Sequence, residues 1–179
     1  RLRGAMGTSF KAPTFLETFS SAFSIGNAAL TPERSRSWEG GVEQQLVGGR
    51  VQLAATFFAQ RFRDLVQYTY IAPATPNYFN VAAASARGLE VTAQGEAARG
   101  ISVWGNATAL RTRVEDAGFQ TGEAATFVEG ARLLRRPPLT VAAGVRLRRL
   151  VRTTLDLSAT HVAARDDRDF SDFPATPVT

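Results

Sequence analysis

The sequence predicts an all-β fold of antiparallel, up-and-down strands, and two observations carry this prediction. First, five runs of the chain alternate apolar and polar residues with a period of two, which gives each strand one apolar face. Second, short and long connections alternate along the chain. Tight turns at one end of a sheet and long loops at the other are typical of transmembrane β-barrels. We therefore expect about seven strands of a larger transmembrane barrel.

The stretch that begins at Gly7 is expected to form the end of the first strand, and a long loop with one short helical turn follows it. Proline cannot donate to a strand ladder and favours extended geometry in the residue before it. Thr31-Pro32 therefore predicts the end of this loop, and the extended run 36–47 follows. The clearest alternation comes next, in 51–60, where Val51, Leu53 and Phe57 oppose Gln52 and Thr56.

The segment 81–98 contains conflicting signals. Its alanines, with Glu, Gln and Arg among them, favour a helix by propensity. However, Gly88 and Gly95 would each cost a helix about 1 kcal/mol, and the alternation from Leu89 onward is regular. We predict a strand. The runs 101–109, 139–148 and 155–160 alternate in the same way and predict three further strands.

The connections have contrasting lengths. In chain order the expected connections are 11–33, 48–49, 72–77, 97–100, 116–136 and 149–152. The first and fifth are long, and every second one is a tight turn. The longest uncharged run, 65–86, contains Pro73, Pro76, Asn77 and Asn80, which excludes a lipid-facing helix there.

Composition narrows the possible functions. The 179 residues include no cysteine, which excludes disulfides and thiolate metal sites. The formal net charge is +5, and Lys11 is the only lysine among 21 cationic residues. Because the arginines are spread over strand ends and turns, a nucleic-acid partner is not expected. The chain starts inside an expected strand and has no initiator methionine, which predicts a fragment of a longer protein.

Two segments carry a specific pattern of residues. Gly-x-x-Phe-Lys-Ala-Pro ends the first expected strand, Asn-x-x-Leu-x-Pro-Glu-x-Ser ends the long loop, and Glu-x-Gly-x-Glu lies in the next strand. Gly88 and Glu90 lie in a later Gly-Leu-Glu run. The positions concerned are Gly7, Phe10, Lys11, Pro13, Asn27, Leu30, Pro32, Glu33, Ser35, Glu39, Gly41, Glu43, Gly88 and Glu90. In these residues the sequence resembles TonB-dependent outer-membrane receptors.

That resemblance implies a bacterial outer-membrane location and a barrel of about 22 strands, of which residues 1–179 would form part of one domain. The plug domain and the terminal strands would be absent from this chain. The receptor would import cobalamin or a ferric siderophore as a monomer surrounded by outer-membrane lipid. The TonB complex would supply energy through the plug, so no enzymatic activity and no cofactor are expected.

Two other classes stay open. A general porin or autotransporter barrel would share the alternation and the loop rhythm, but not the Phe-Lys-Ala-Pro to Pro-Glu-x-Ser run. A soluble β-sandwich binding module would need a second sheet over its apolar faces. In most runs the opposite face is polar, which suits a water-filled lumen better than a buried core.

No catalytic or metal-binding residues are predicted. His161, the only histidine, is on the opposite strand face from Asp156 and Ser158, which prevents a local catalytic triad. The acidic residues of 166–172 lack the turn glycine and terminal glutamate of a calcium loop.

The ligand-binding residues are not predicted. Two aromatic groups have two interpretations each. Tyr68, Tyr70, Tyr78 and Phe79 suit an interfacial belt more than ligand stacking. Phe15, Phe19 and Phe23 suit loop packing more than a ligand contact.

Overall fold

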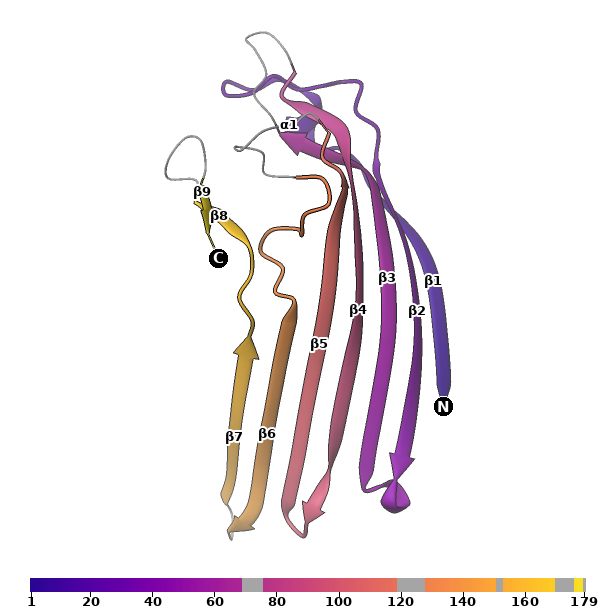
Figure 1. Ribbon diagram of the computed structural model, residues 1–179, viewed down its shortest axis with the longest axis vertical. Coiled ribbons are helices and arrows are strands. Elements are labelled where there is room, and N and C mark those ends of the chain that lie inside the picture. Colours follow the sequence, from indigo (N-terminus) through magenta and orange to yellow (C-terminus); the bar gives the residue numbers. More distant parts are fainter. Residues whose placement is uncertain (69–75, 119–127, 151–152, 170–175, 179) are drawn as a thin grey trace.

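A computed structural model describes residues 1–68, 76–118, 128–150, 153–169 and 176–178. Seven strands form one antiparallel sheet in which every strand pairs with its sequence neighbours (Figure 1). The strands are β1 (Leu2–Lys11), β2 (Glu33–Leu46), β3 (Val51–Tyr68), β4 (Tyr78–Ala98), β5 (Ile101–Asp116), β6 (Leu139–Leu150) and β7 (Thr153–Val162). The up-and-down topology and the number of strands in this sheet are as predicted.

The segment 81–98 is a strand, as predicted, and β4 is the longest element in the described chain. It pairs with β3 on one side and β5 on the other, so its backbone donors and acceptors are used in two ladders. This pairing outweighs the helical propensity of its alanines, which is a few tenths of a kcal/mol per residue. The expected start of β2 was three residues too late, since the strand begins at Glu33.

Short elements occupy the connections. The predicted helical turn is α1 (Phe15–Thr18), and the first tight turn is the 3-10 turn η1 (Val47–Gly49). A small second sheet, which was not predicted, consists of β8 (Asp167–Asp169) paired with β9 (Thr176–Val178). Figure 1 shows the described parts of the long connections at one end of the large sheet, and the tight turns that follow β2 and β4 at the other end. We call these the loop end and the turn end.

Strand register gives the large sheet two different faces. Ala55 pairs with Val91, Val91 with Ala107 and Ala107 with Val141, so one row of apolar residues crosses four strands. Parallel rows extend from Val51 to Ala59 on β3, about 26 Å of strand at roughly 3.3 Å per residue. We call this side the apolar face and the other side the polar face. A tilted transmembrane β-strand needs about 9–11 residues, and the positions from Val51 to Ala59 reach this length.

The sheet has no hydrophobic core of the kind a soluble domain has. Among the described residues, the buried apolar side chains are Ala82, Ala84 and Val114, whereas Leu53, Phe57 and Leu157 of the apolar face are 39–55% exposed. No second sheet covers that face in the described chain, so the β-sandwich hypothesis was wrong. No helix in the described segments is long and apolar enough to cross a bilayer.

Hydrogen bonds cross the polar face between strands. The Arg3 Nη2 donates to Thr56 Oγ1 at 2.6 Å across β2, and Gly41 lies between them. A Cβ on Gly41 would come within 2.9 Å of Thr56 Oγ1 and 3.0 Å of Arg3 Nε. The absence of a side chain therefore leaves room for this bond. Arg146 pairs with Asp156 at 2.6 Å on the same face.

Candidate functional site: the polar network at the loop end

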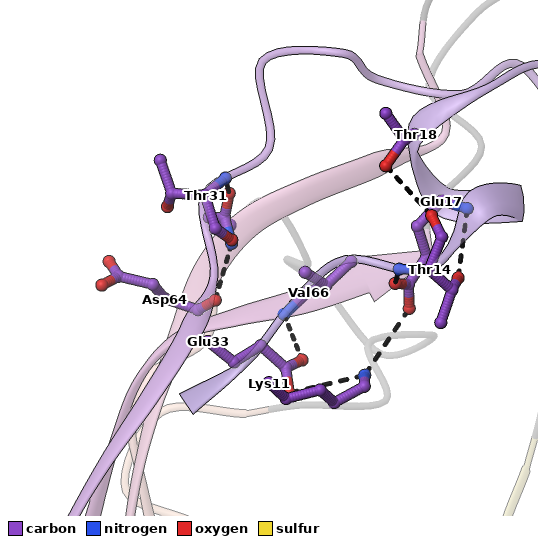
Figure 2. A network of polar contacts seen from close by, with 9 residues as sticks. Lys11, Thr14, Glu17, Thr18, Thr31, Glu33, Asp64 and Val66 are labelled. Atoms are coloured by element: carbon purple, nitrogen blue, oxygen red, sulfur yellow. Dashed lines mark hydrogen bonds and ion pairs between the residues drawn. The ribbon is translucent and has the colours of Figure 1, made fainter. Parts of the chain in front are cut away.

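Lys11, the last residue of β1, lies at the centre of a polar network at the loop end (Figure 2). It pairs in register with Glu33, the first residue of β2. Its Nζ is 3.5 Å from Glu33 Oε2 and 3.7 Å from Glu17 Oε1 in α1. One cation therefore connects the end of one strand, the start of the next and the loop between them.

Glu17 is held by the helix turn that it helps to start. Thr14 caps α1, and the two residues form a capping box. The Thr14 N–H donates to Glu17 Oε2 at 2.6 Å, and the Glu17 N–H donates to Thr14 Oγ1 at 3.3 Å. Burial raises the pKa of Glu17, but the Thr14 hydrogen bonds and the Lys11 charge outweigh burial and lower the pKa below its ordinary 4.5.

Glu33 also ties β2 to β3. Its Oε1 accepts from the Val66 N–H at 2.9 Å, at a point where the β3–β4 register shifts. Asp64, within this irregularity, has a φ of 57°. A bulge leaves backbone groups without ladder partners, and here a side chain satisfies one of them.

Asn80, on β4, also satisfies backbone groups near this irregularity. Its Nδ2 lies 2.7 Å from the Asp64 carbonyl and 2.8 Å from the Thr31 carbonyl, and its Oδ1 accepts from the Thr31 N–H at 2.7 Å. The neighbouring Asn77 accepts at Oδ1 from the Ile25 N–H at 2.7 Å, and its own N–H donates to the Ile25 carbonyl at 2.8 Å. These two asparagines attach the loop to β4.

Asn27 completes the anchoring from within the loop. Its Nδ2 donates to the Tyr78 carbonyl at 2.9 Å, and its Oδ1 accepts from the Ala29 N–H at 2.9 Å. Its backbone N–H donates to the Glu17 carbonyl at 2.8 Å. These contacts thus join the loop 12–32 to the end of β1 and to the start of β4. The pattern residues predicted from the sequence include Lys11, Asn27 and Glu33 but neither Asn77 nor Asn80.

The other pattern residues lie elsewhere. Pro13, Leu30 and Pro32 are half-buried in or beside the loop. Gly7 and Ser35 are on the polar face of β1 and β2, where Ser35 Oγ lies 2.7 Å from Ser9 Oγ.

Four more pattern residues follow the polar face toward the turn end: Glu39, Glu43, Gly88 and Glu90. Glu43 accepts from Gln52 at 2.7 Å, and Gln94 donates to Gln52 at 2.8 Å. Phe10 lies on the apolar face and is 75% exposed. The structure therefore brings together Lys11, Asn27 and Glu33 and leaves the rest distributed along the strands.

The aromatic groups are only partly assembled. Phe15 and Phe19 have ring centroids 4.7 Å apart, but α1 ends before Phe19, and Phe23 is 94% exposed. The expected helical stripe is therefore limited to one pair. Tyr68 and Tyr78 meet edge to face at 5.3 Å, whereas Tyr70 lies outside the described residues.

The described chain offers no catalytic or metal-binding cluster. His161 is exposed and pairs with Val141 on the apolar face, while Asp156 and Ser158 are on the polar face. Within the described segments, no three His, Asp or Glu side chains lie close enough to hold a metal ion. Asp167 instead pairs with Arg135 at 2.8 Å.

The open antiparallel sheet has one apolar face of membrane-spanning length, one polar face, and long loops at the end opposite the tight turns. These features are typical of part of a transmembrane β-barrel. The chain matches the family described as "TonB dependent receptor-like, beta-barrel" over residues 1–177, so it belongs to that family. Barrels of this family lie in the bacterial outer membrane.

Solved structures with the same fold include three receptors. The ferric-catecholate import receptor Fiu of E. coli K12 has a TM-score of 0.69 and 15% identity over 96% of this chain and 23% of its own. P. aeruginosa FpvA bound to heterologous pyoverdines has a TM-score of 0.71 and 15% identity, over 99% of this chain and 22% of the FpvA chain. The siderophore receptor PiuA of Acinetobacter baumannii has a TM-score of 0.67 and 17% identity, over 98% of this chain and 25% of the PiuA chain. The chain thus spans about a quarter of each receptor.

The lowered pKa of Glu17 predicts a pH-dependent loop anchor. A depressed folded-state pKa contributes stability above the ordinary pKa, and this contribution is lost as pH falls through the folded value. Hydrogen-exchange protection of the Thr14 and Glu17 amides should therefore be constant from pH 7 to about pH 5 and fall in more acidic buffer. Glu17→Gln should remove this pH dependence, whereas Glu39→Gln, on an exposed strand position, should keep it. Wild-type protection that does not change down to pH 3 would contradict the prediction.

Proposed function

We propose that the receptor containing this chain imports a ferric siderophore across the outer membrane. The observation that carries the proposal is the network of Lys11, Glu17, Glu33 and Asn80, which holds a long loop above the open end of a family barrel. A loop fixed at its base can present side chains to a ligand at a low ordering cost. The three receptors above are described with ferric catecholates, pyoverdines or siderophores, which favours this cargo over cobalamin.

In this proposal residues 1–179 form part of one barrel domain and supply strands and extracellular loops. A plug domain elsewhere in the receptor contacts the TonB complex, which provides the energy for uptake. The full-length receptor acts as a monomer. The barrel performs no covalent chemistry, so we assign it neither catalytic residues nor a cofactor.

Uptake in the host bacterium tests this function. Cells with and without the receptor gene would be given radiolabelled iron on catecholate and pyoverdine-type siderophores, and labelled cobalamin, with the TonB complex active or inactivated. We expect uptake of one ferric siderophore that requires both the receptor and active TonB. If the receptor supported uptake of cobalamin alone, the proposed siderophore cargo would be wrong and cobalamin would be the cargo. Receptor-dependent leakage of small solutes without TonB would instead favour the porin hypothesis.

A further inference from the structure

The strand register gathers arginines that are distant in the sequence. Arg36 pairs with Arg61, and Arg87 pairs with Arg111. Arg113 faces Ser85, which also pairs with Arg61. These five residues, which we call the arginine patch, come from β2, β3, β4 and β5. All five are exposed and lie on the apolar face, between the apolar rows and the loop end.

The patch has little neutralising charge. In the described part of the chain, its one ion pair joins Arg113 Nε to Glu115 Oε2 at 3.8 Å. The other four arginines have no carboxylate within 4.0 Å among the described residues. Like charges directly opposite each other on neighbouring strands destabilise a sheet. Two such pairs in adjacent positions indicate that an anion from outside the chain compensates them.

The patch surrounds a groove. A space of about 580 Å³ is lined by Arg36, Arg61, Arg87, Arg111 and Arg113, together with the small side chains of Ala59 and Ser85. Guanidinium groups bind phosphate oxygens with paired N–H donors. A groove of this size, lined by five arginines, is suited to a phosphorylated headgroup rather than to a single small ion.

The groove is continuous with the lipid-facing surface. Trp38 and Phe57 also line it, with ring centroids 5.2 Å apart. On β3, Phe57 is next to Ala55 and then Leu53 on the same apolar face, toward the turn end. A molecule with phosphate at one end and acyl chains at the other would therefore contact guanidinium, aromatic and aliphatic groups in that order. Amphipathic aromatic rings are typical of the boundary between headgroups and acyl chains.

We propose that the arginine patch binds the phosphorylated headgroup of an anionic lipid in the outer leaflet of the outer membrane. Long loops face the cell exterior in these barrels, which places the patch at the height of that leaflet's headgroups. The acyl chains of the lipid lie along the apolar face below Trp38 and Phe57. This site is on the outside of the barrel and is independent of the imported cargo.

Binding to the purified full-length receptor tests the site. The probe is bisphosphorylated lipid A, titrated into receptor in a neutral detergent, with dephosphorylated lipid A and inorganic phosphate as separate arms. Each basic residue near an anionic lipid headgroup contributes roughly a fivefold gain in affinity. The triple variant Arg61→Gln/Arg87→Gln/Arg111→Gln should therefore bind lipid A on the order of 100-fold more weakly. The variant Arg50→Gln/Arg99→Gln/Arg148→Gln removes the same charge at the turn end and should bind like wild type.

A gain of affinity provides a second, independent test. Glu115→Gln removes the carboxylate that competes for Arg113 and should strengthen lipid A binding several-fold, which a misfolded variant would not do. Dephosphorylated lipid A should bind weakly, and millimolar inorganic phosphate should not displace lipid A. Equal binding by wild type and the patch variant, equal losses in both triple variants, or displacement by inorganic phosphate would overturn the proposal.

Discussion

Val91→Arg should destabilise the folded receptor by about 2–4 kcal/mol, the cost of an arginine at the bilayer midplane on the lipid face of a barrel. Val91 lies in the row between Ala55 and Ala107, near the middle of the apolar band, and is 40% exposed. An arginine there would carry its charge into hydrocarbon. The measurement is the urea concentration at which half of the full-length receptor unfolds in phosphatidylcholine vesicles, followed by its heat-modifiable gel shift.

Thr92→Arg is the matched control because Thr92 is the next residue and pairs with Ala54 and Asn106 on the polar face. A substitution in a solvated environment changes stability by about 0.5 kcal/mol or less. The two variants carry the same charge one residue apart, so only the face differs. Equal destabilisation by both would mean that the apolar face does not contact lipid.

Gly88→Ala should destabilise the receptor by about 1–3 kcal/mol, the usual cost of overpacking. Gly88 is buried on the polar face of β4, and the Phe58 ring covers it. A Cβ at this position would lie 2.5 Å from the Ala109 carbonyl oxygen and 2.6 Å from Phe58 Cζ. Rotation of the ring relieves only the second contact, because the first is with backbone. The same urea titration in vesicles measures the effect.

Gly40→Ala is the control for Gly88→Ala. A Cβ on Gly40 would meet no atom within 4 Å, so alanine should be neutral or stabilise by up to about 1 kcal/mol by restricting the unfolded chain. If Gly88→Ala unfolds at the same urea concentration as Gly40→Ala, the close approach of Phe58 and Ala109 to β4 is not a feature of the folded receptor.

The strands were predictable because alternation is a local property. Each of the five alternating runs needs one face in lipid and one in water, and that demand appears directly in the order of residues. The helical turn at Phe15–Thr18 was also predictable, but its capping pair of Thr14 and Glu17 was not singled out. The hairpin of β8 and β9 was missed because its three-residue strands are too short to show a period.

The candidate site was only half predictable. Lys11, Asn27 and Glu33 belong to a specific pattern around one long loop, but other contacts that hold this loop come from residues about 50 positions further along the chain. Asn77 reaches Ile25, and Asn80 reaches Thr31. These bonds depend on β4 being positioned beside the loop by its pairing with β3, and no local pattern encodes that contact.

The class of fold, the alternating faces and the family follow from the order of residues, because alternation and loop length are local properties of the chain. Which arginines are neighbours depends on how the strands pair. In the sequence the arginines are scattered, and no cluster was predicted among Arg36, Arg61, Arg87, Arg111 and Arg113. Antiparallel register brings them together, because each strand reverses direction and returns its loop-end residues to the same height as those of its neighbour.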